Sequence, residues 1–327
     1  MTVLVTGGCG YIGCHLVWAL HDRGAPVVVL DNLSTGFDWA IPKDVMLVRG
    51  DIGDGRLLDR TLREQQIDTV IHFAASSVVP ESVADPLAFY GNNTGKSRNL
   101  IAAAVRAGVK TFLFSSTAAV YGNPKIVPVR EDAETRPMSP YGASKLMTEM
   151  MLADVSRAHD LHYAALRYFN VAGADPSGRC GQSTAKASHL IKAACETALG
   201  LRPEIEVFGS QFETPDGTGV RDYIHVSDLV DAHLLILDQL RAKKANLVLN
   251  CGYGRGFSVL EVLAAVERAA GREFPIRYSA RRPGDPAIAY ASTELLHQAI
   301  DWQPKWNDID AIVGHALAWE KRRLGKS

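Results

Sequence analysis

Three glycines at three-residue spacing follow the first apolar run of the chain. Gly7, Gly10 and Gly13 come after the run 3–5 and open an amphipathic stretch that ends near residue 23. A strand, a glycine turn and a helix in this order let the backbone approach a pyrophosphate, which then faces the helix N-terminus. The second strand-like run ends at Asp31, 18 positions after Gly13, where a carboxylate can bind the adenosine ribose. The pattern predicts a dinucleotide site, and NAD rather than NADP, because a carboxylate repels a 2′-phosphate. The alternative is a tight turn followed by a strand-end carboxylate.

Strand-like and helical runs alternate through the first half of the chain. The strand-like runs are 3–6, 27–30, 46–48, 69–73, 111–115 and 163–167, and the helical runs are 12–23, 55–65, 86–107 and 140–159. This alternation predicts an α/β fold with a Rossmann-type doubly wound parallel sheet. We expect residues 1–169 to form the NAD-binding domain.

After about residue 170 the pattern becomes irregular. Helical runs at 189–198 and 259–270 are separated by loops rich in glycine, proline and charge. We expect residues 170–327 to form mainly a smaller C-terminal α/β lobe that binds the substrate. A helical run at 228–240 and a strand-like run at 247–250 leave open the alternative that 223–252 rejoins the first domain.

Composition excludes several classes of partner. A chain of 327 residues with 47% hydrophobic content can bury a large core without disulfides. The formal charge of −1, with acidic and basic residues interspersed, argues against a nucleic-acid or membrane surface. Five scattered cysteines without ligand spacing favour reduced thiols in a cytoplasmic protein, with no metal site. We expect neither a membrane span nor a signal peptide.

Tyr141 and Lys145 stand four residues apart in a helical run and therefore share a helix face. A free phenol titrates near about 10, and a cation at roughly 6 Å in an effective dielectric of about 20 lowers that pKa by about two units. Lys145 could supply most of this shift, and an oxidised nicotinamide could supply more. Thr117, at the end of the fifth strand-like run, is placed to hydrogen-bond the substrate hydroxyl from which Tyr141 would take a proton. The spacing alone is common on helices, but its combination with Thr117 and the glycine turn predicts a proton-transfer site beside a redox cofactor.

These motifs resemble the extended short-chain dehydrogenase/reductase family. More narrowly, the chain resembles the UDP-glucose 4-epimerases within it. The similarity extends over nearly the whole chain, and its most specific part is the second half. The motifs that carry it are 31–32, 72–74, 115–117, 140–145, 167–170, 216–226 and 281–285.

The resemblance implies a reversible 4-epimerisation of a UDP-hexose. Tyr141 would take the proton of the sugar 4-hydroxyl while NAD accepts the hydride, and the 4-keto sugar would turn and take the hydride back on its other face. The implied catalytic residues are Thr117, Tyr141 and Lys145. The implied NAD contacts are Gly7, Gly10, Tyr11, Ile12, Gly13, Asp31, Asn32, Asp51, Ile52, Phe73, Ala74, Asn92, Tyr141, Lys145 and Phe169. The implied substrate contacts are Thr117, Tyr141, Asn170, His189, Leu190, Val207, Phe208, Arg221, Arg282, Asp285 and Ala289. The resemblance also implies a homodimer formed through the two long helical runs.

Four departures from the family pattern bear on detail. Ser77 stands where several members have lysine, and the segment 92–97 differs after its paired asparagines. His189 replaces an asparagine of some relatives, and we expect it to be structural rather than catalytic. Ala289 stands where glucose-restricted relatives carry tyrosine, which predicts tolerance of N-acetylhexosamine substrates.

Four other activities are alternatives to the 4-epimerisation of a UDP-hexose. A 4,6-dehydratase is disfavoured because Ala118 and Ala119 follow Thr117 where an acidic pair would be needed. A UDP-pentose 4-epimerase is the closest alternative. A dehydrogenase that releases NADH and a non-catalytic NAD- and nucleotide-binding regulator remain further alternatives.

Overall fold

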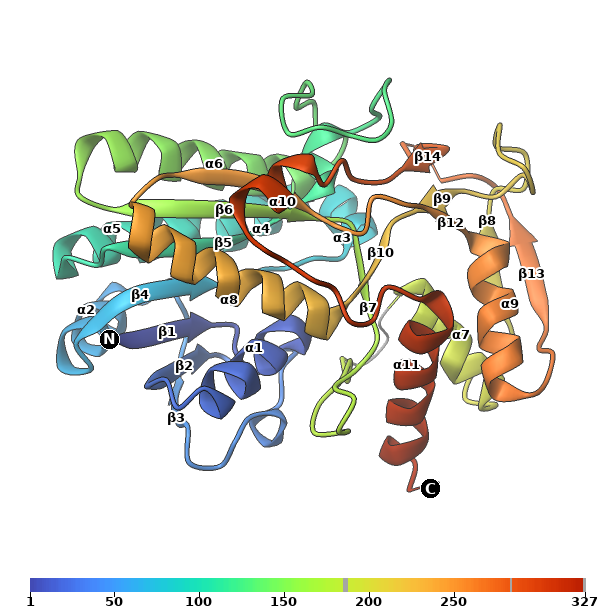
Figure 1. The fold of residues 1–327 in the computed structure, drawn as a ribbon, viewed down its shortest axis with the longest axis horizontal. Helices are drawn as coiled ribbons and strands as arrows, with labels where there is room; N and C mark the ends of the chain where they lie inside the picture. The colour runs from blue at the N-terminus through green and yellow to red at the C-terminus, as the bar shows by residue number, and fades with distance from the viewer. Residues whose placement is uncertain (185–187, 283, 326–327) are drawn as a thin grey trace.

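A seven-stranded parallel sheet forms the centre of the molecule, seen in a computed structural model that describes residues 1–184, 188–282 and 284–325 (Figure 1). The strand order is β11-β6-β5-β4-β1-β2-β3. The strands are β1 (Thr2–Thr6), β2 (Val27–Asp31), β3 (Met46–Arg49), β4 (Ile67–His72), β5 (Thr111–Thr117), β6 (His162–Tyr168) and β11 (Leu247–Cys251). The doubly wound parallel sheet expected from the sequence is confirmed.

Helices cover both faces of this sheet. On one face, α1 (Tyr11–Asp22) and α8 (Val226–Lys243) pack together, with Leu16 and Leu237 in one buried cluster. On the other face lie α2 (Gly55–Glu64), α5 (Lys96–Ala107) and α6 (Pro140–Ala158), with Leu58 and Leu152 in a second cluster. Neighbouring β1 residues divide between the clusters, because side chains of a strand alternate between faces.

The continuous helix expected over 86–107 is interrupted. The structure has a short α4 (Pro86–Phe89), a π-helical turn (Tyr90–Gly95) and then α5. Asn93 is buried in that turn, where its Oδ1 accepts from Ser76 N at 2.8 Å and its Nδ2 donates to Ser144 Oγ at 3.1 Å. These tertiary contacts tie the turn to α6 and to the loop after β4, which explains why helical periodicity alone did not reveal it.

The second half of the chain divides its elements between the main sheet and a smaller lobe. Strand β11 pairs with β6, so the segment that contains α8 and β11 returns to the central sheet. The lobe contains the helices α7 (Leu190–Ala198), α9 (Val259–Ala270) and α11 (Ile309–Arg323) together with short sheets (Figure 1). Its strands are β7 (Asn170–Ala172), β8 (Ile205–Phe208), β9 (Val220–Arg221), β10 (Tyr223–His225), β12 (Phe257–Ser258), β13 (Ile276–Ser279) and β14 (Ile288–Ala289). Its main helices α7, α9 and α11 share a third buried cluster.

The remaining helices are short, namely α3 (Val79–Ala84) and α10 (Glu294–Ala299), with 3₁₀ turns at Asp38–Ala40 and Ala118–Tyr121. Among the described residues, we find no helix with the length and apolar character that crossing a membrane requires.

Candidate functional site

A large cavity of about 980 Å³ runs along the carboxyl ends of the parallel strands and continues to the smaller lobe. Ligands of open α/β sheets bind in such a crevice. Every residue expected to contact NAD contributes to its wall. The wall also includes Thr117, Asn170, His189, Arg221, Asp285 and Ala289 from the expected substrate set.

The glycine turn is shaped by steric limits at two of its three glycines. Gly7 has a φ of +71°, and a Cβ there would lie 2.6 Å from Ala74 N. A Cβ on Gly13 would lie 2.2 Å from Gly7 O, so α1 can pack this close to the turn only with glycine at that position. At Gly10, which precedes α1, a Cβ would contact only Gly7 O, at 3.2 Å, and the residue borders the cavity. This open position before a helix N-terminus fits a diphosphate.

Two carboxylates in the cavity wall, those of Asp31 and Asp51, are held in place by hydrogen bonds. Asp31 accepts hydrogen bonds from Cys9 N at 2.9 Å and Leu33 N at 2.8 Å, so its orientation is set by the backbone. Asp51 accepts from Gly53 N and from Lys96 Nζ, both at 2.7 Å. Burial raises the pKa of Asp51, but these hydrogen bonds outweigh it and hold the pKa below its usual range. Asp31 lies at the end of β2, which is where a ribose hydroxyl can be bound.

Ser77, at the position where a lysine was noted in relatives, lies in the cavity wall beside Ser76. Asn92 Nδ2 donates to Ser76 Oγ at 3.0 Å, so the π-helical turn supports this loop on the cofactor side. The loop is therefore held by amide and hydroxyl groups.

The three expected catalytic side chains meet in the middle of the cavity. Thr117 lies at the end of β5, and Tyr141 and Lys145 occupy successive turns of α6. Burial raises the pKa of Tyr141, while a side-chain hydrogen bond with Thr117 opposes that shift. The hydroxyl and the phenol are thus within reach of one substrate oxygen, as proton transfer requires.

The Lys145 side chain is buried against a backbone carbonyl and an aromatic ring. Its Nζ donates to Ser115 O at 2.8 Å and lies 5.0 Å from the centroid of the Phe114 ring. Burial lowers the pKa of Lys145 to about 7, although Glu149 opposes the shift. Burial raises the pKa of Tyr141 and so opposes the lowering that its spacing to Lys145 predicts. The contribution of Lys145 stays a prediction, and it depends on protonation of a lysine whose own pKa is lowered by desolvation.

The far end of the cavity carries an incompletely paired cation. Arg221 donates from Nη1 to Val220 O at 2.8 Å, and no carboxylate within the described part of the chain lies at ion-pair distance from it. Its neighbour Asp222 is occupied by backbone N–H groups, including those of Tyr253 at 3.0 Å and Gly254 at 3.1 Å. Burial lowers the pKa of Arg221. The Arg221 guanidinium therefore suits an anionic ligand such as a diphosphate.

Four expected substrate contacts lie outside the wall of the main cavity. Leu190 lines a smaller neighbouring cavity, and the Val207 side chain is buried in the core of the lobe. The Arg282 guanidinium carbon lies 3.6 Å from the centroid of the Phe208 ring, and Arg282 is exposed. Pro283, which belongs to the same motif, falls outside the described residues. Motif membership predicted Arg282 as a contact, but its side chain packs on Phe208.

Several wall residues were not expected from the sequence. Tyr121 lies in the wall and donates to Asn250 Oδ1 at 2.7 Å, and Arg167 donates to the Tyr121 hydroxyl at 2.9 Å. The position of Tyr121, four residues after Thr117, was a sequence signal that could have identified Tyr121 as a wall residue. Gln182 donates to His189 Nδ1 at 2.7 Å, which gives His189 a fixed place in the wall. Gln182 lies in an irregular segment with no pattern that could reveal it.

The fold and the site define a class: a Rossmann-type protein with the Tyr-x-x-x-Lys arrangement of short-chain dehydrogenases and reductases. A family model described as the NAD dependent epimerase/dehydratase family matches residues 3–252. The chain belongs to this family.

Individual relatives agree with this assignment. The chain is 55% identical over 319 residues to a UDP-glucose 4-epimerase of Azospirillum brasilense, covering 98% of this chain and 92% of the relative. Its structure is similar to that of a UDP-glucose-4-epimerase from Stenotrophomonas maltophila with bound NAD and formylated UDP-arabinopyranose, at a TM-score of 0.95 and 39% identity over 100% of both chains. The UDP-Glc/GlcNAc 4-epimerase of Campylobacter jejuni has a TM-score of 0.86 and 40% identity, with 98% of this chain and 99% of that chain covered. The expected resemblance to UDP-glucose 4-epimerases and the expected NAD cofactor are confirmed.

Proposed function

We propose that this protein interconverts UDP-glucose and UDP-galactose by reversible 4-epimerisation with NAD retained between turnovers. The observation that carries the proposal is the cavity whose wall contains Thr117 and Tyr141 together with the glycine turn and Arg221. In this arrangement, a dinucleotide, a sugar hydroxyl and a diphosphate can bind at adjoining positions in the cavity. NAD, when bound, supplies the hydride acceptor and donor for sugar C4.

The chain's own residues manage the proton and the position of the substrate. Tyr141 takes the proton of the 4-hydroxyl as that carbon is oxidised and returns it on reduction, while Thr117 holds the same oxygen. Lys145 becomes a stronger support for a tyrosinate when it is protonated, because a nearby positive charge favours the charged phenol. Arg221 binds the diphosphate, and Asn170 and Asp285 border the same end of the cavity. This tethering leaves the oxidised sugar able to turn and present its opposite face.

Product analysis tests the reaction directly. Purified protein incubated with UDP-galactose and no added NAD should form UDP-glucose until the two reach equilibrium, without accumulating free NADH. NMR of the sugar products and absorbance of released cofactor measure both quantities. Stoichiometric NADH release would indicate a dehydrogenase. Unchanged substrate, with NAD and the UDP-sugar both bound, would indicate the non-catalytic regulator.

We also propose that the substrate range includes UDP-N-acetylhexosamines. Ala289 is 9% exposed in β14 and borders the cavity with only a methyl group. Ala289→Tyr should abolish most turnover of UDP-GlcNAc while turnover of UDP-galactose stays within a few-fold of the original. Parallel rate measurements with UDP-galactose, UDP-GlcNAc and UDP-xylose check this range. Absence of UDP-GlcNAc turnover in the unmodified protein, or an unchanged range in Ala289→Tyr, would contradict the role of Ala289. A preference for UDP-xylose would favour the pentose alternative.

We propose a homodimer formed through α3, α4 and α6. Val83, Leu87 and Met150 are 64%, 79% and 60% exposed on these helices, which contact one another. Apolar side chains gathered on one surface are typical of an interface. Sedimentation equilibrium should give a dimer, and Met150→Glu should shift it toward monomer, whereas Ile126→Glu, at an apolar residue outside these helices that is 76% exposed, should not. A monomer at all concentrations would exclude the proposal.

The free state of all five cysteines supports a reducing compartment such as the cytoplasm.

A further inference from the structure

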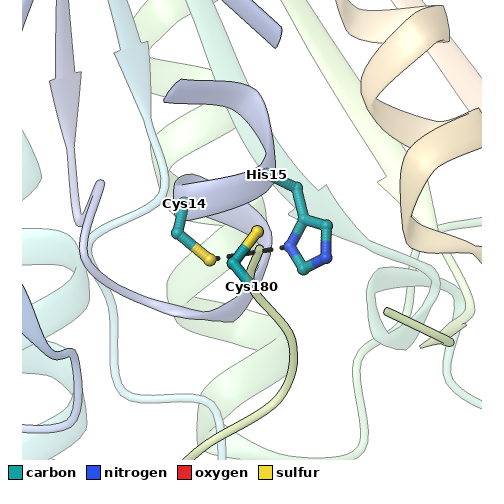
Figure 2. A group of neighbouring side chains, drawn as sticks. All are labelled: Cys14, His15 and Cys180. Atoms are coloured by element: carbon teal, nitrogen blue, oxygen red, sulfur yellow. Dashed lines mark hydrogen bonds between the residues drawn. The ribbon is translucent and has the colours of Figure 1, made fainter. Parts of the chain in front are cut away.

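Three side chains of metal-binding type gather beside the glycine turn but outside the cavity. Cys14 and His15 belong to α1, and Cys180 belongs to the loop between β7 and α7 (Figure 2). Their ligand atoms all lie within 4.8 Å of one another, and the residues are 1%, 5% and 0% exposed. Within the described ranges, this is the one group of three or more such side chains. The reaction proposed above uses none of them.

The spacing of this cluster matches a tetrahedral zinc site. Zinc bonds of about 2.3 Å to sulfur and about 2.0 Å to nitrogen place these ligands roughly 3.5 Å apart at a tetrahedral angle. Cys14 Sγ lies 3.6 Å from His15 Nδ1, and Figure 2 shows the Cys180 sulfur beside them. Two thiolates and a neutral imidazole also cancel the charge of Zn²⁺. A neutral complex avoids the cost of burying a net charge.

The His15 ring can turn toward a metal at the cost of one hydrogen bond. His15 Nδ1 lies 2.7 Å from Tyr11 O, and the Cys14 thiol donates to the same carbonyl at 3.2 Å. His15 Nε2 is buried without a hydrogen-bond partner among the described residues. Turning the ring toward the sulfurs therefore gives up one side-chain hydrogen bond.

The loop that carries Cys180 is already docked on α1. Arg179 Nη1 donates to Asp22 at 2.7 Å, and its guanidinium lies 4.7 Å from the centroid of the Trp18 ring. Asp175 accepts from Arg179 Nε at 2.9 Å within the same loop. The cluster is thus preorganised by contacts that do not depend on a metal.

We propose that Cys14, His15 and Cys180 bind one Zn²⁺. Binding converts both thiols to thiolates and releases two protons, while the Nδ1 proton of the neutral imidazole moves to Nε2 and Nδ1 becomes the ligand. A water molecule completes the tetrahedron. The ion fastens the loop of Cys180 to the first turns of α1. Because Gly13 and Gln182 border the cavity next to these ligands, the ion also steadies two parts of its wall.

Cobalt is the probe that reports this geometry, because tetrahedral Co²⁺ bound to thiolates absorbs visible light. Chelator-treated protein should bind one Co²⁺ with thiolate-to-cobalt and visible bands, and Zn²⁺ should remove both. Cys14→Ser and Cys180→Ser should each weaken Zn²⁺ binding about 100-fold or more and reduce the thiolate bands, and the double variant should lose these bands. Cys195→Ser and Cys251→Ser are matched controls at buried cysteines outside the cluster, and they should leave the spectrum unchanged.

Measurements on the unmodified protein test the proposed Zn²⁺ site even if a serine variant does not fold. Competition between the protein and a chromophoric chelator for Zn²⁺ should give one site per chain. Absence of that site, or a cobalt spectrum without thiolate bands, would overturn the proposal. Thiolate bands that persist in a folded double variant, Cys14→Ser with Cys180→Ser, would overturn it as well.

Discussion

Tyr141→Phe should lower kcat by about 10²–10⁴-fold, the usual contribution of a positioned acid-base group. The substitution removes only the phenol oxygen, so NAD and the UDP-sugar should still bind. Rates of UDP-galactose conversion, with NAD content and UDP affinity measured on the same preparation, check this result. The loss should appear in kcat rather than KM, because the phenol acts mainly as the proton moves.

Tyr163→Phe is the matched control. Tyr163 is a buried tyrosine of β6 outside the cavity wall, so removal of its hydroxyl should leave turnover near that of the unmodified protein. If Tyr141→Phe retains turnover within a few-fold, another group is the base, and the assignment of Tyr141 is wrong.

Gly13→Ala should destabilise the protein by about 1–3 kcal/mol, as overpacking does, and should abolish NAD retention. The new Cβ would lie 2.2 Å from Gly7 O and 2.8 Å from Gly8 Cα, both backbone atoms that cannot move aside without shifting the turn. Urea unfolding and the nucleotide content of the purified protein measure the two effects.

Gly10→Ala separates fold from cofactor binding. Its Cβ would contact only Gly7 O at 3.2 Å, and Gly10 has a φ of −78°, which alanine adopts without strain. The unfolding free energy should therefore stay nearly unchanged while the methyl group weakens NAD binding. Equal NAD retention in Gly10→Ala and the unmodified protein would show that the diphosphate does not approach this turn.

The fold could be predicted largely because its signals are local. A parallel strand buried on both faces reads as an apolar run, and the helices between such strands have clear boundaries. The π-helical turn could not be predicted, since the hydrogen bonds of Asn93 with Ser76 and Ser144 hold it in place. Those partners are distant in sequence, and helical spacing carries no trace of them.

Site residues could be predicted where a short sequence motif by itself determines the position of the side chain or turn. The glycine turn, Asp31 and the shared helix face of Tyr141 and Lys145 follow from short spacings, and the structure brings all of them to the cavity. Arg282 shows the limit, because the same motif allows its side chain to face a ligand or to pack on Phe208.

The sequence by itself determined the order of strands and helices, the close turn before α1, and the pairing of a phenol with an amine on α6. Tertiary structure decided the properties that depend on surroundings. Burial sets the pKa of Lys145 to about 7, so its charge could not be inferred from its spacing to Tyr141. Cys14 and Cys180 are 166 positions apart, and no spacing rule joined them until the loop after β7 folded onto α1. Sequence specifies neighbours along a helix or strand, whereas solvation and long-range contacts exist only once the chain has packed.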